Sequence, residues 1–308
     1  MLAPMGRIVV IGDALIDELR DDANVREFVG GAALNVAVGL ARLGLATTLV
    51  AMVGDDEPGA HIRAYLDDYG VDLLASPAPL GSARAVSTRT AGGEPAYAFN
   101  EAARARRIRF GDAERDAIAH AAFVVVSCFA FDDAEQTDEL VAALAATDAP
   151  VAVDPNPRAG MLHDRAAFVA GFEGVARHAA LVKIGDDDAA LLYGAPLDAI
   201  REELVRDGTR AVLATRGREG AEVEAGGLVV ARPVSALPGP VVDTMGAGDA
   251  VFSSAVASVL FELPADAEGW GRVLDRAMDV AAATCRFEGA LLRTPSALSG
   301  LDLDRLGT

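Results

Sequence analysis

The chain is poor in cysteine and in lysine. Only Cys128 and Cys285 occur among 308 residues, far apart and in apolar surroundings, so a disulfide framework is excluded. A single disulfide between them stays open, but two reduced thiols are the preferred interpretation. Lys183 is the only lysine, and no Gly-Lys-Ser/Thr sequence exists, which excludes a Walker-type phosphate loop.

Positive charge as a whole is also scarce. The chain has 27 basic and 46 acidic residues, which give it a net charge of −19. Nucleic acids and anionic membranes require a basic surface, so neither is expected as a partner. The longest uncharged runs stop at about fifteen residues, short of the roughly eighteen that indicate a membrane span. Met1 to Gly12 lacks the pattern of a secretion signal, and we therefore expect a cytoplasmic protein.

Several catalytic patterns are missing as well. The histidines, His61, His120, His163 and His178, have no metal-ligand spacing. There is no Gly-x-Ser-x-Gly elbow of a serine hydrolase, and no Gly-x-Gly-x-x-Gly dinucleotide loop follows the first apolar run. What is abundant is apolar sequence, 52% of the chain, which is enough for a large core.

The apolar residues form short runs that alternate with segments of helical periodicity. The runs that indicate buried strands are Arg7–Gly12, Thr47–Gly54, Phe123–Phe129, Val151–Asp154, Leu181–Ile184 and Ala211–Thr215. The segments that indicate helices include Asn35–Leu43, Gly59–Tyr69, Ala134–Ala146, Leu197–Asp207 and a run from Asp249 to Phe261. This alternation predicts an α/β fold, a mostly parallel sheet covered by helices on both faces.

Two stretches break this rhythm. Asp17–Gly30 is polar, and Ala83–Phe110 alternates around a Gly-Gly turn signal. Both are interpreted as extra antiparallel strands that form a small lid over the ligand edge of the main sheet, although a merely decorative hairpin is the alternative. With no repeat or linker present, we expect one domain over 1–308, with lid segments at about 13–30 and 84–110.

The most informative motif lies at Asp243-Thr244-Met245-Gly246-Ala247-Gly248-Asp249, just before an apolar helix. Small residues at a helix start let backbone amides surround an anion, and the helix dipole favours negative charge there. Asp249 adds a carboxylate at the same place, which a simple helix cap does not explain. An anion hole beside a carboxylate suits transfer of a phosphoryl group to a hydroxyl. We expect the helix N-terminus to lower the pKa of Asp249.

Polar residues also follow other predicted strands, where ligands bind in parallel sheets. Asp13 and Asp17 follow the first strand, and Asn35 lies in an apolar helix behind the pair Gly30-Gly31. Arg158 ends the stiff loop Asp154–Arg158 and would reach an anion. Thr215–Gly220 is a glycine-spaced turn that would suit a nucleotide. Each of these segments also has a purely structural alternative. Asp13 and Asp17 could be ordinary turn residues, Asn35 could bond to the chain, and Thr215–Gly220 could be a plain hairpin turn.

Together these segments resemble the PfkB-type carbohydrate kinases, the ribokinase-like family, over essentially the whole chain. Gly30–Gly44 and Asp243–Asp249 are similar to the family's two signatures, and Val53–Gly59, Asp154–Arg158 and Thr215–Gly220 to blocks between them. The resemblance implies a Rossmann-like three-layer α/β/α domain with a β-lid, which transfers the γ-phosphoryl group of ATP to a sugar hydroxyl with Mg²⁺.

The resemblance also implies roles for individual residues. Asp249 would be the catalytic base, with Gly246, Ala247 and Gly248 as the anion hole. The residues implied on the sugar side are Asp13, Asp17, Gly30, Gly31, Asn35, Phe99 and Arg158. Those implied near the nucleotide are Lys183, Thr215, Gly217, Gly220 and Gly248. Asp188 would organise Mg²⁺ through water, and Asp243 would be a ligand of a monovalent cation such as K⁺.

The sequence departs from the family pattern in three places. Met245 stands where many members have threonine, which leaves cation activation open. Asp188 is a shorter acid than the family's glutamate, and Phe99-Asn100 replaces an aromatic pair in the lid. These departures keep a non-catalytic sugar- or nucleotide-binding regulator as a rival reading.

Similarity to fructokinase members favours phosphorylation of D-fructose at O6. Ribose, a phosphosugar or a sugar acid such as 2-keto-3-deoxygluconate are the alternatives, and the run Arg104–Arg109 bears on them. Most of its arginines are expected to form a solvated face, but one or two that point inward would favour an anionic sugar. Apolar alternation at Ala96, Ala98 and Ala102 predicts a homodimer formed through the lid.

Overall fold

In the computed structural model, residues 6–20, 25–88 and 96–299 are described. Within them, nine strands form one sheet in the order β13-β12-β11-β10-β9-β8-β1-β4-β5. All neighbours from β11 to β5 are parallel, and β12 and β13 add an antiparallel edge. The strands are β1 Ile8–Gly12, β4 Thr47–Met52, β5 Asp72–Ser76, β8 Phe123–Ser127, β9 Val151–Asp154, β10 Leu181–Gly185, β11 Ala211–Thr215, β12 Ala221–Ala225 and β13 Leu228–Arg232.

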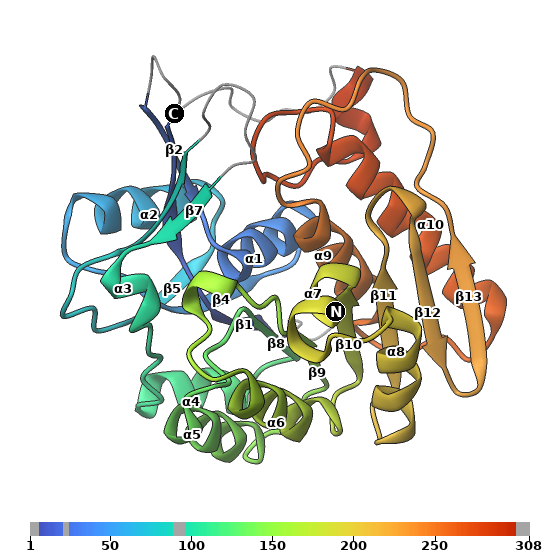
Figure 1. The fold of residues 1–308 in the computed structure, drawn as a ribbon, viewed down its shortest axis with the longest axis horizontal. Coiled ribbons are helices and arrows are strands. Elements are labelled where there is room, and N and C mark those ends of the chain that lie inside the picture. The colour runs from blue at the N-terminus through green and yellow to red at the C-terminus, as the bar shows by residue number, and fades with distance from the viewer. Residues whose placement is uncertain (1–5, 21–24, 89–95, 300–308) are drawn as a thin grey trace, which may run out of the picture.

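Helices cover both faces of this sheet and create two separate cores (Figure 1). On one face lie α1 Ala32–Arg42, α2 Glu57–Asp68, α9 Ala247–Val259 and α10 Ala267–Thr284. On the other lie α4 Asp112–Ala119, α5 Ala134–Leu144, α6 Arg165–Ala176, α7 Asp186–Tyr193 and α8 Leu197–Arg206. Successive residues of β1 alternate between the two cores, as a strand buried on both faces requires. The expected three-layer α/β/α fold is confirmed.

The six strands expected from apolar runs are all present, but three others were missed. β5 lies at the edge of the sheet and is only partly buried, so its apolar signal is weak. β12 alternates buried alanine and valine with half-buried glutamate, a pattern typical of an exposed antiparallel edge. Edge strands carry less apolar sequence, so they do not appear as apolar runs.

A second, four-stranded sheet has the order β3-β2-β6-β7 and lies beside the carboxyl edge of the main sheet (Figure 1). Its strands are β2 Leu15–Arg20, β3 Val25–Gly30, β6 Ala83–Thr88 and β7 Ala96–Phe99. The expectation of purely antiparallel strands is wrong, because β2 and β6 pair in parallel. Each continues from a parallel strand of the main sheet, β1 and β5, so both leave it in the same direction.

The strand reading of the second lid segment is also wrong beyond Phe99. Asn100 caps the short helix α3 Glu101–Arg104, and its side-chain oxygen accepts from the Ala103 amide at 2.9 Å and the Arg84 amide at 3.0 Å. Its amide nitrogen donates to the Ser82 carbonyl at 3.0 Å. Asn100 therefore fastens both ends of the β6–β7 pair where they join the body of the protein. The expected Gly-Gly turn lies outside the described residues.

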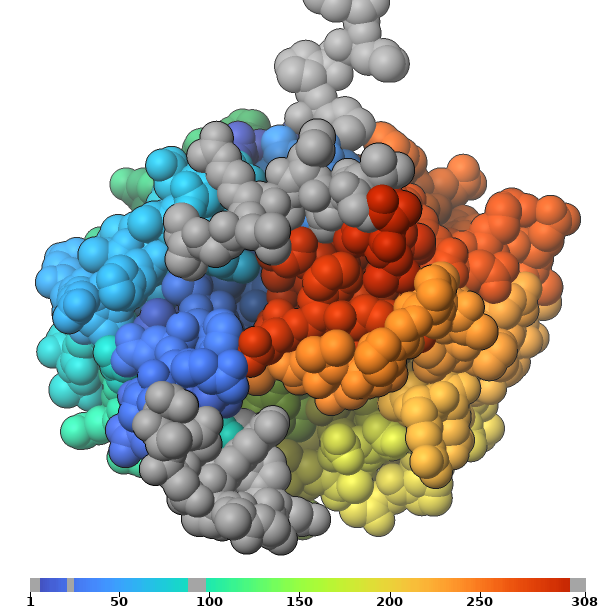
Figure 2. Space-filling model, turned by 90° about the horizontal axis from the view of Figure 1, so that it is seen from above, coloured from blue at the N-terminus to red at the C-terminus, as the bar shows by residue number. Residues whose placement is uncertain are grey.

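No helix among the described residues combines the length and the apolar character that crossing a bilayer requires. Seen from above, N-terminal segments in blue and cyan form one half of the visible face and C-terminal segments in orange and red form the other (Figure 2). Helices α1 and α9, which come from these two halves, pack against each other through Gly39, where an added Cβ would lie 2.7 Å from Ser253 Oγ.

Candidate active site

Side chains from distant parts of the sequence meet at the carboxyl ends of β1, β9, β10 and β11. Asp13 directly follows β1, Asp154 ends β9, and Thr215 ends β11. Lys183, within β10, bonds to Asp154, and Asn35 of α1 bonds to Asp249 of α9. The strand ends and the two helices thus bring most of the residues expected in the site to one edge of the sheet.

Asp249 lies in the first turn of α9 and is 8% exposed. Its Oδ2 accepts a hydrogen bond from Asn35 Nδ2 at 2.8 Å, which explains the isolated asparagine in α1. Burial raises the pKa of Asp249, and the Asn35 bond and the charges of Lys183 and Arg158 only partly oppose it. The expected fall in pKa is therefore wrong, because desolvation outweighs the helix N-terminus.

The N-terminus of α9 has the geometry of an anion hole. Gly246, its N-cap, has φ 72° and no side-chain cap, and an added Cβ would lie 2.6 Å from Ala290 Cα. Only glycine fits this combination of close approach and left-handed backbone. The Ala247 amide, however, donates to the Thr244 carbonyl at 3.2 Å. Of the three expected anion-hole residues, Gly248 is thus better placed than Ala247 to offer its amide to a ligand.

Lys183 is buried beside that helix start. Its Nζ lies 2.9 Å from Asp154 Oδ2 and 3.9 Å from Asp188 Oδ2, and 3.5 Å from the position of a Cβ added to Gly248. Burial alone would lower the pKa of Lys183, but the carboxylates of Asp154, Asp188 and Asp249 outweigh it and raise the pKa. The ammonium group is therefore a permanent positive charge next to the anion hole.

On the other side of Asp249, Asp13 holds helix α1 in place. Its Oδ1 accepts from the Ala33 amide at 2.9 Å, and its carbonyl accepts from the Leu34 amide at 3.1 Å. Gly31 has φ 107°, and an added Cβ there would lie 2.9 Å from the Asp13 carbonyl oxygen. Asp13 and Gly31 were expected to bind substrate; the contacts present are those that fix the start of α1.

Asp17, by contrast, has no such structural hydrogen bond to another described residue, and it faces the site. It lies on β2, and an added Cβ at its neighbour Gly30 would lie 2.1 Å from its Oδ2, so any side chain at position 30 would displace this carboxylate. Burial and then the nearby Asp13 raise the pKa of Asp17 to about 7, against the charge of Arg158. A buried acid with a perturbed pKa beside other ionisable groups makes Asp17 a candidate functional residue.

This raised pKa predicts a pH-dependent stability. The folded protein holds the Asp17 proton between its ordinary pKa of 3.8 and about 7, so stability from this group is greatest below pH 3.8 and is lost as pH rises through 7. Urea unfolding of wild type and Asp17→Asn at pH 5 and pH 8 tests this. The variant should gain more stability relative to wild type at pH 8 than at pH 5, because the wild type loses this stability progressively between pH 3.8 and about 7; an equal effect at both pH values would contradict it.

Arg158 and Phe99 border the site where the small sheet meets the body. Arg158 is exposed, yet its charge acts on Asp13, Asp17 and Asp249 and opposes their raised pKa values. Phe99 ends β7 and lies over Gly160, where an added Cβ would be 2.7 Å from Phe99 Cδ2. Gly160 belongs to the short 3₁₀ helix Ala159–Met161.

The expected nucleotide residues follow β11. Thr215 ends the strand, and Gly217, with φ 48°, opens the 3₁₀ helix Gly217–Glu219. Gly220 has φ 106°, and an added Cβ would lie 2.1 Å from the Arg232 carbonyl oxygen, so β13 runs directly against this turn. Arg216 pairs with Asp198 of α8, which fixes the loop from the other side.

The expected metal and cation residues are engaged in bonds of their own. Asp188 Oδ2 accepts from the Gly185 amide at 2.7 Å, at the start of α7. Asp243 Oδ1 accepts from the Met245 amide at 3.0 Å and Oδ2 from the Gly289 amide at 3.1 Å, joining two loops. Within the part of the chain that is described, no group of three or more His, Cys, Asp or Glu residues is arranged to hold a metal.

Sequence reasoning missed the roles of two residues. Asp154 was quoted only as part of a stiff loop, yet it is fully buried and is the direct partner of Lys183. A lone lysine in an apolar strand signals a buried partner, which would have pointed to it. Arg106 was grouped with its arginine neighbours, but its side chain turns inward toward Met161 and Phe129.

Comparison with known proteins agrees with this geometry. The model of the pfkB family carbohydrate kinases matches residues 5–297. A fructokinase from Rhizobium leguminosarum bv. trifolii is 29% identical over 262 residues, 82% of this chain and 79% of that protein. An acarbose 7(IV)-phosphotransferase from an Actinoplanes species is 32% identical over 222 residues, 71% of this chain and 69% of that protein.

A solved structure shares the fold. The fructokinase with bound ATP from Xylella fastidiosa superposes with a TM-score of 0.80 at 22% identity, over 96% of this chain and 97% of that one. The family match spans nearly the whole chain and includes every site residue described above. The chain therefore belongs to the pfkB family of carbohydrate kinases.

Proposed function

We propose that the protein transfers the γ-phosphoryl group of ATP to a hydroxyl group of a sugar. The observation that carries this proposal is the pair Asn35–Asp249 at the uncapped start of α9, with Lys183 beside it. A buried carboxylate that is held by an amide and faces an anion-binding helix start suits a hydroxyl that attacks a phosphoryl group.

In this mechanism the sugar lies between Asp17 and Asp249. Asn35 orients the Asp249 carboxylate, which accepts the proton of the attacking hydroxyl as the O–P bond forms. The transition state of phosphoryl transfer is loose, so positioning and charge stabilisation supply most of the catalysis. The Gly248 amide and the Lys183 ammonium stabilise charge on the transferring group, an effect of several kcal/mol for comparable donors.

Residues toward the nucleotide are assigned in the same proposal. Thr215, Gly217 and Gly220 would border ATP at the end of β11. Mg²⁺, when bound with ATP, would neutralise phosphate charge. Asp188 is the residue that would help to hold it through water, because its Oδ2 accepts from the Gly185 amide and its Oδ1 is left for a ligand. The small sheet β3-β2-β6-β7 would close as a lid, with Phe99 where it joins the body, and exclude water that would otherwise hydrolyse ATP.

The favoured substrate is D-fructose, phosphorylated at O6. The support is the similarity to fructokinases, whereas the Actinoplanes relative shows that the family also contains a kinase named for a different acceptor. A coupled ADP-release assay across fructose, ribose, 2-keto-3-deoxygluconate, nucleosides and fructose phosphates tests this. Turnover of an acid without turnover of fructose would remove fructose; turnover of no compound would count against the kinase.

The monovalent cation yields a separate prediction. Both Asp243 oxygens already accept backbone amides, so the loop before α9 is held without a cation. We therefore expect the same kcat/KM in K⁺ as in Na⁺ at equal ionic strength. A K⁺-dependent rate that disappears in Asp243→Asn would contradict this and would make Asp243 a cation ligand.

Assembly through the lid also remains a proposal, with narrower support. Ala98 on β7 is exposed, but Ala102 lies in α3 and is 1% exposed, so it cannot contribute to a lid surface. Ala96 lies on the edge strand β7, and open strand edges call for a cover.

A further inference from the structure

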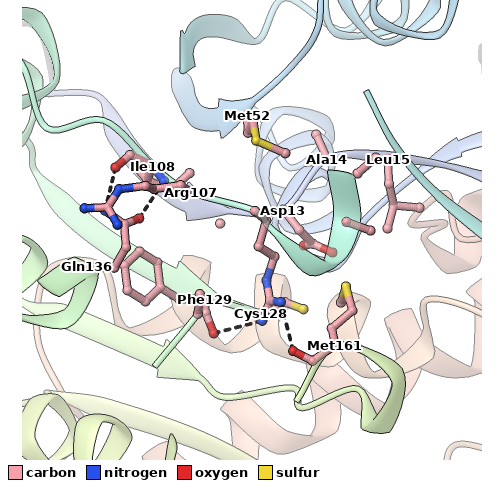
Figure 3. Close-up of a pocket in the computed structure, with 15 residues that line it drawn as sticks. Asp13, Ala14, Leu15, Met52, Arg107, Ile108, Cys128, Phe129, Gln136 and Met161 are labelled. Carbon is pink, nitrogen blue, oxygen red and sulfur yellow. Dashed lines mark hydrogen bonds between the residues drawn. The ribbon is translucent and has the colours of Figure 1, made fainter. Parts of the chain in front are cut away.

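The joint between the small sheet and the body of the protein contains a cavity and little apolar bulk. The cavity has an empty volume of about 410 Å³, including its open mouth, and Figure 3 shows Leu15, Met52 and Met161 around it. Ala83, the first residue of β6, also lines it. The buried residues that pack together across the joint are mostly small, namely Leu15, Ala32, Ala83, Ala85, Ala103, Cys128 and Met161. Apolar packing alone therefore leaves the position of the small sheet weakly defined.

Three polar side chains, those of Asp56, Ser82 and Asn100, form a chain of hydrogen bonds at the same joint, which we call the clamp. Asp56 Oδ2 accepts from the Ser82 amide at 2.8 Å, and its Oδ1 accepts from the Ser82 hydroxyl at 2.5 Å. Asn100 Nδ2 donates to the Ser82 carbonyl at 3.0 Å. Ser82 is thus held through its amide, its hydroxyl and its carbonyl.

The segment Val53–Gly59 supplies the body side of the clamp. Asp56 is the N-cap of α2, and its Oδ1 also accepts from the Gly59 amide at 2.9 Å. The Ser82 hydroxyl in turn accepts from the Gly54 amide at 3.1 Å. Burial opposes the charge of Asp56, but the hydrogen bonds from Ser82 and Gly59 outweigh burial and lower the pKa of Asp56. The clamp is therefore fixed to α2 by a carboxylate that is ionised at neutral pH.

On the side of the small sheet, the clamp stands at both ends of the strand pair β6–β7. Ser82 directly precedes β6, and Asn100 directly follows β7. The Asn100 amide donates to the Arg84 carbonyl at 3.1 Å, and the Asn100 Oδ1 accepts from the Arg84 amide at 3.0 Å. Further along the chain, Gln136 of α5 bonds to both backbone groups of Ile108. The clamp thus marks the boundary between the small sheet and the body.

The strands that the clamp holds determine where Asp17 lies. Asp17 on β2 pairs in register with Ala85 on β6, and Ala85 pairs in register with Phe99 on β7. Residues that lie directly opposite one another in a sheet share a face, so these three side chains form one row across the small sheet. The clamp holds the chain neighbours of two of them, because Arg84 precedes Ala85 and Asn100 follows Phe99.

We infer that Asp56 and Asn100 are positioning residues for sugar binding, which act through Ser82 and β6 on the place of the Asp17 carboxylate. This rests on the proposed kinase function, in which the sugar lies between Asp17 and Asp249. With the clamp intact, the row that contains Asp17 has a fixed place over the site. With the clamp broken, β6 can shift toward the cavity beside it, and the sugar hydroxyls meet a poorly placed acceptor.

The chemical step should be affected much less than sugar binding. The pair Asn35–Asp249 and the Lys183 ammonium belong to α1, α9 and β10, and none of these elements is part of the small sheet. The groups that would act on the transferring phosphoryl group therefore keep their places when the clamp is lost. A positioning role of this kind predicts a change in KM for the sugar at a nearly constant kcat.

The test is a measurement of kcat and KM for the best sugar of the panel, at saturating ATP, with wild type, Asp56→Asn and Asn100→Asp. Asp56→Asn keeps an oxygen for the Gly59 amide, and so the cap of α2, but turns its NH₂ group toward the Ser82 amide. Asn100→Asp keeps the oxygen that accepts two backbone amides but loses the donor to the Ser82 carbonyl. Asp56→Asn should raise KM roughly tenfold, as expected for one lost hydrogen bond to a charged group. Asn100→Asp should raise KM as well, and both should leave kcat nearly unchanged.

The control is Asp55→Asn, the next residue along the chain. Its side chain is 99% exposed and pairs with Arg63 at the surface, so KM and kcat should stay at their wild-type values. A wild-type KM in both Asp56→Asn and Asn100→Asp would overturn the inference. A fall in kcat at unchanged KM would overturn it too, because the clamp would then act on the chemical step.

A double-mutant cycle tests whether the clamp acts through Asp17. Asp56→Asn should raise KM less in an Asp17→Asn background than in wild type, because the group that the clamp positions is already lost. An equal rise in both backgrounds would show that the clamp does not act through Asp17, and would overturn the inference while leaving the kinase proposal intact.

Amide hydrogen exchange adds a readout that is independent of turnover. The amides of β6 and of its neighbour β2 should exchange faster in Asp56→Asn than in wild type, whereas those of β1 and β8 should be unchanged. Unchanged exchange in β6 would overturn the inference whatever the enzyme turns over. Absence of ADP release with every sugar would instead count against the kinase proposal, and faster exchange in β6 would still support the clamp.

Discussion

Asp249→Asn is expected to lower kcat by about 10²- to 10⁴-fold, the usual contribution of a general base. The substitution keeps the shape of the side chain but removes the group that would take the hydroxyl proton. Because that interaction is made in the transition state, binding of sugar and ATP should be largely retained. The measurement is steady-state ADP release with the best sugar, together with calorimetric binding of sugar and ATP.

The control is Asp67→Asn, an exposed carboxylate on α2 far from the strand ends. It should leave kcat and binding unchanged. The kinase reading would fail if Asp249→Asn kept wild-type turnover. It would also fail if wild type bound both sugar and ATP yet released no ADP with any sugar, which is the behaviour of a binding regulator.

The same variant has an expected effect on stability. Burial raises the pKa of Asp249 above 3.8, so its ionised form opposes folding, and stability from this group is lost as pH rises through the folded pKa. Asp249→Asn should therefore be at least as stable as wild type at neutral pH. An active site that costs stability is a common trade-off in enzymes, and a strongly destabilised variant would contradict this view.

Lys183→Met is expected to have the largest effect on folding, a loss of about 3–5 kcal/mol in the free energy of unfolding. Lys183 is buried between Asp154, at 2.9 Å, and Asp188, at 3.9 Å. Removing the ammonium leaves both carboxylates buried without their partner, and Asp154 is fully buried. Urea unfolding at pH 7 measures the loss.

A double-mutant cycle separates this effect from ordinary loss of packing. Lys183→Met combined with Asp154→Asn should be more stable than Lys183→Met alone, because the second change removes the unpaired charge. Lys183 stays charged at both pH 6 and pH 8, but burial raises the pKa of Asp154 to about 7, so the coupling should be larger at pH 8, where this carboxylate is ionised, than at pH 6. Additive losses would show that the ion pair does not carry the stability.

The sequence predicted the main sheet and the site wherever local signals were strong. Buried parallel strands appear as apolar runs, and the glycines at 31 and 246 stand where a positive φ and a close backbone approach require them. The motif around Asp249 and the isolated Asn35 each pointed to the site, although 214 residues separate the two in the chain.

What the sequence did not reveal depends on long-range geometry. The direction of β6 relative to β2 follows from how both strands leave the main sheet, which no local pattern records. The pKa of Asp249 depends on how deeply α1 and α9 bury it, and the competing helix dipole was given too much weight. Arg106 and Arg107 are adjacent in the sequence, and the local pattern does not show which of the two side chains points inward.

We propose that this site moves a phosphoryl group from ATP to a sugar. ³¹P NMR of wild type with ATP, Mg²⁺ and a sugar of the panel measures all phosphorus-containing products together. We expect one phosphorylated sugar for each ADP formed, and neither product above background with Asp249→Asn. Formation of ADP with free phosphate and no sugar phosphate, or sugar phosphate at the wild-type rate in the variant, would contradict it.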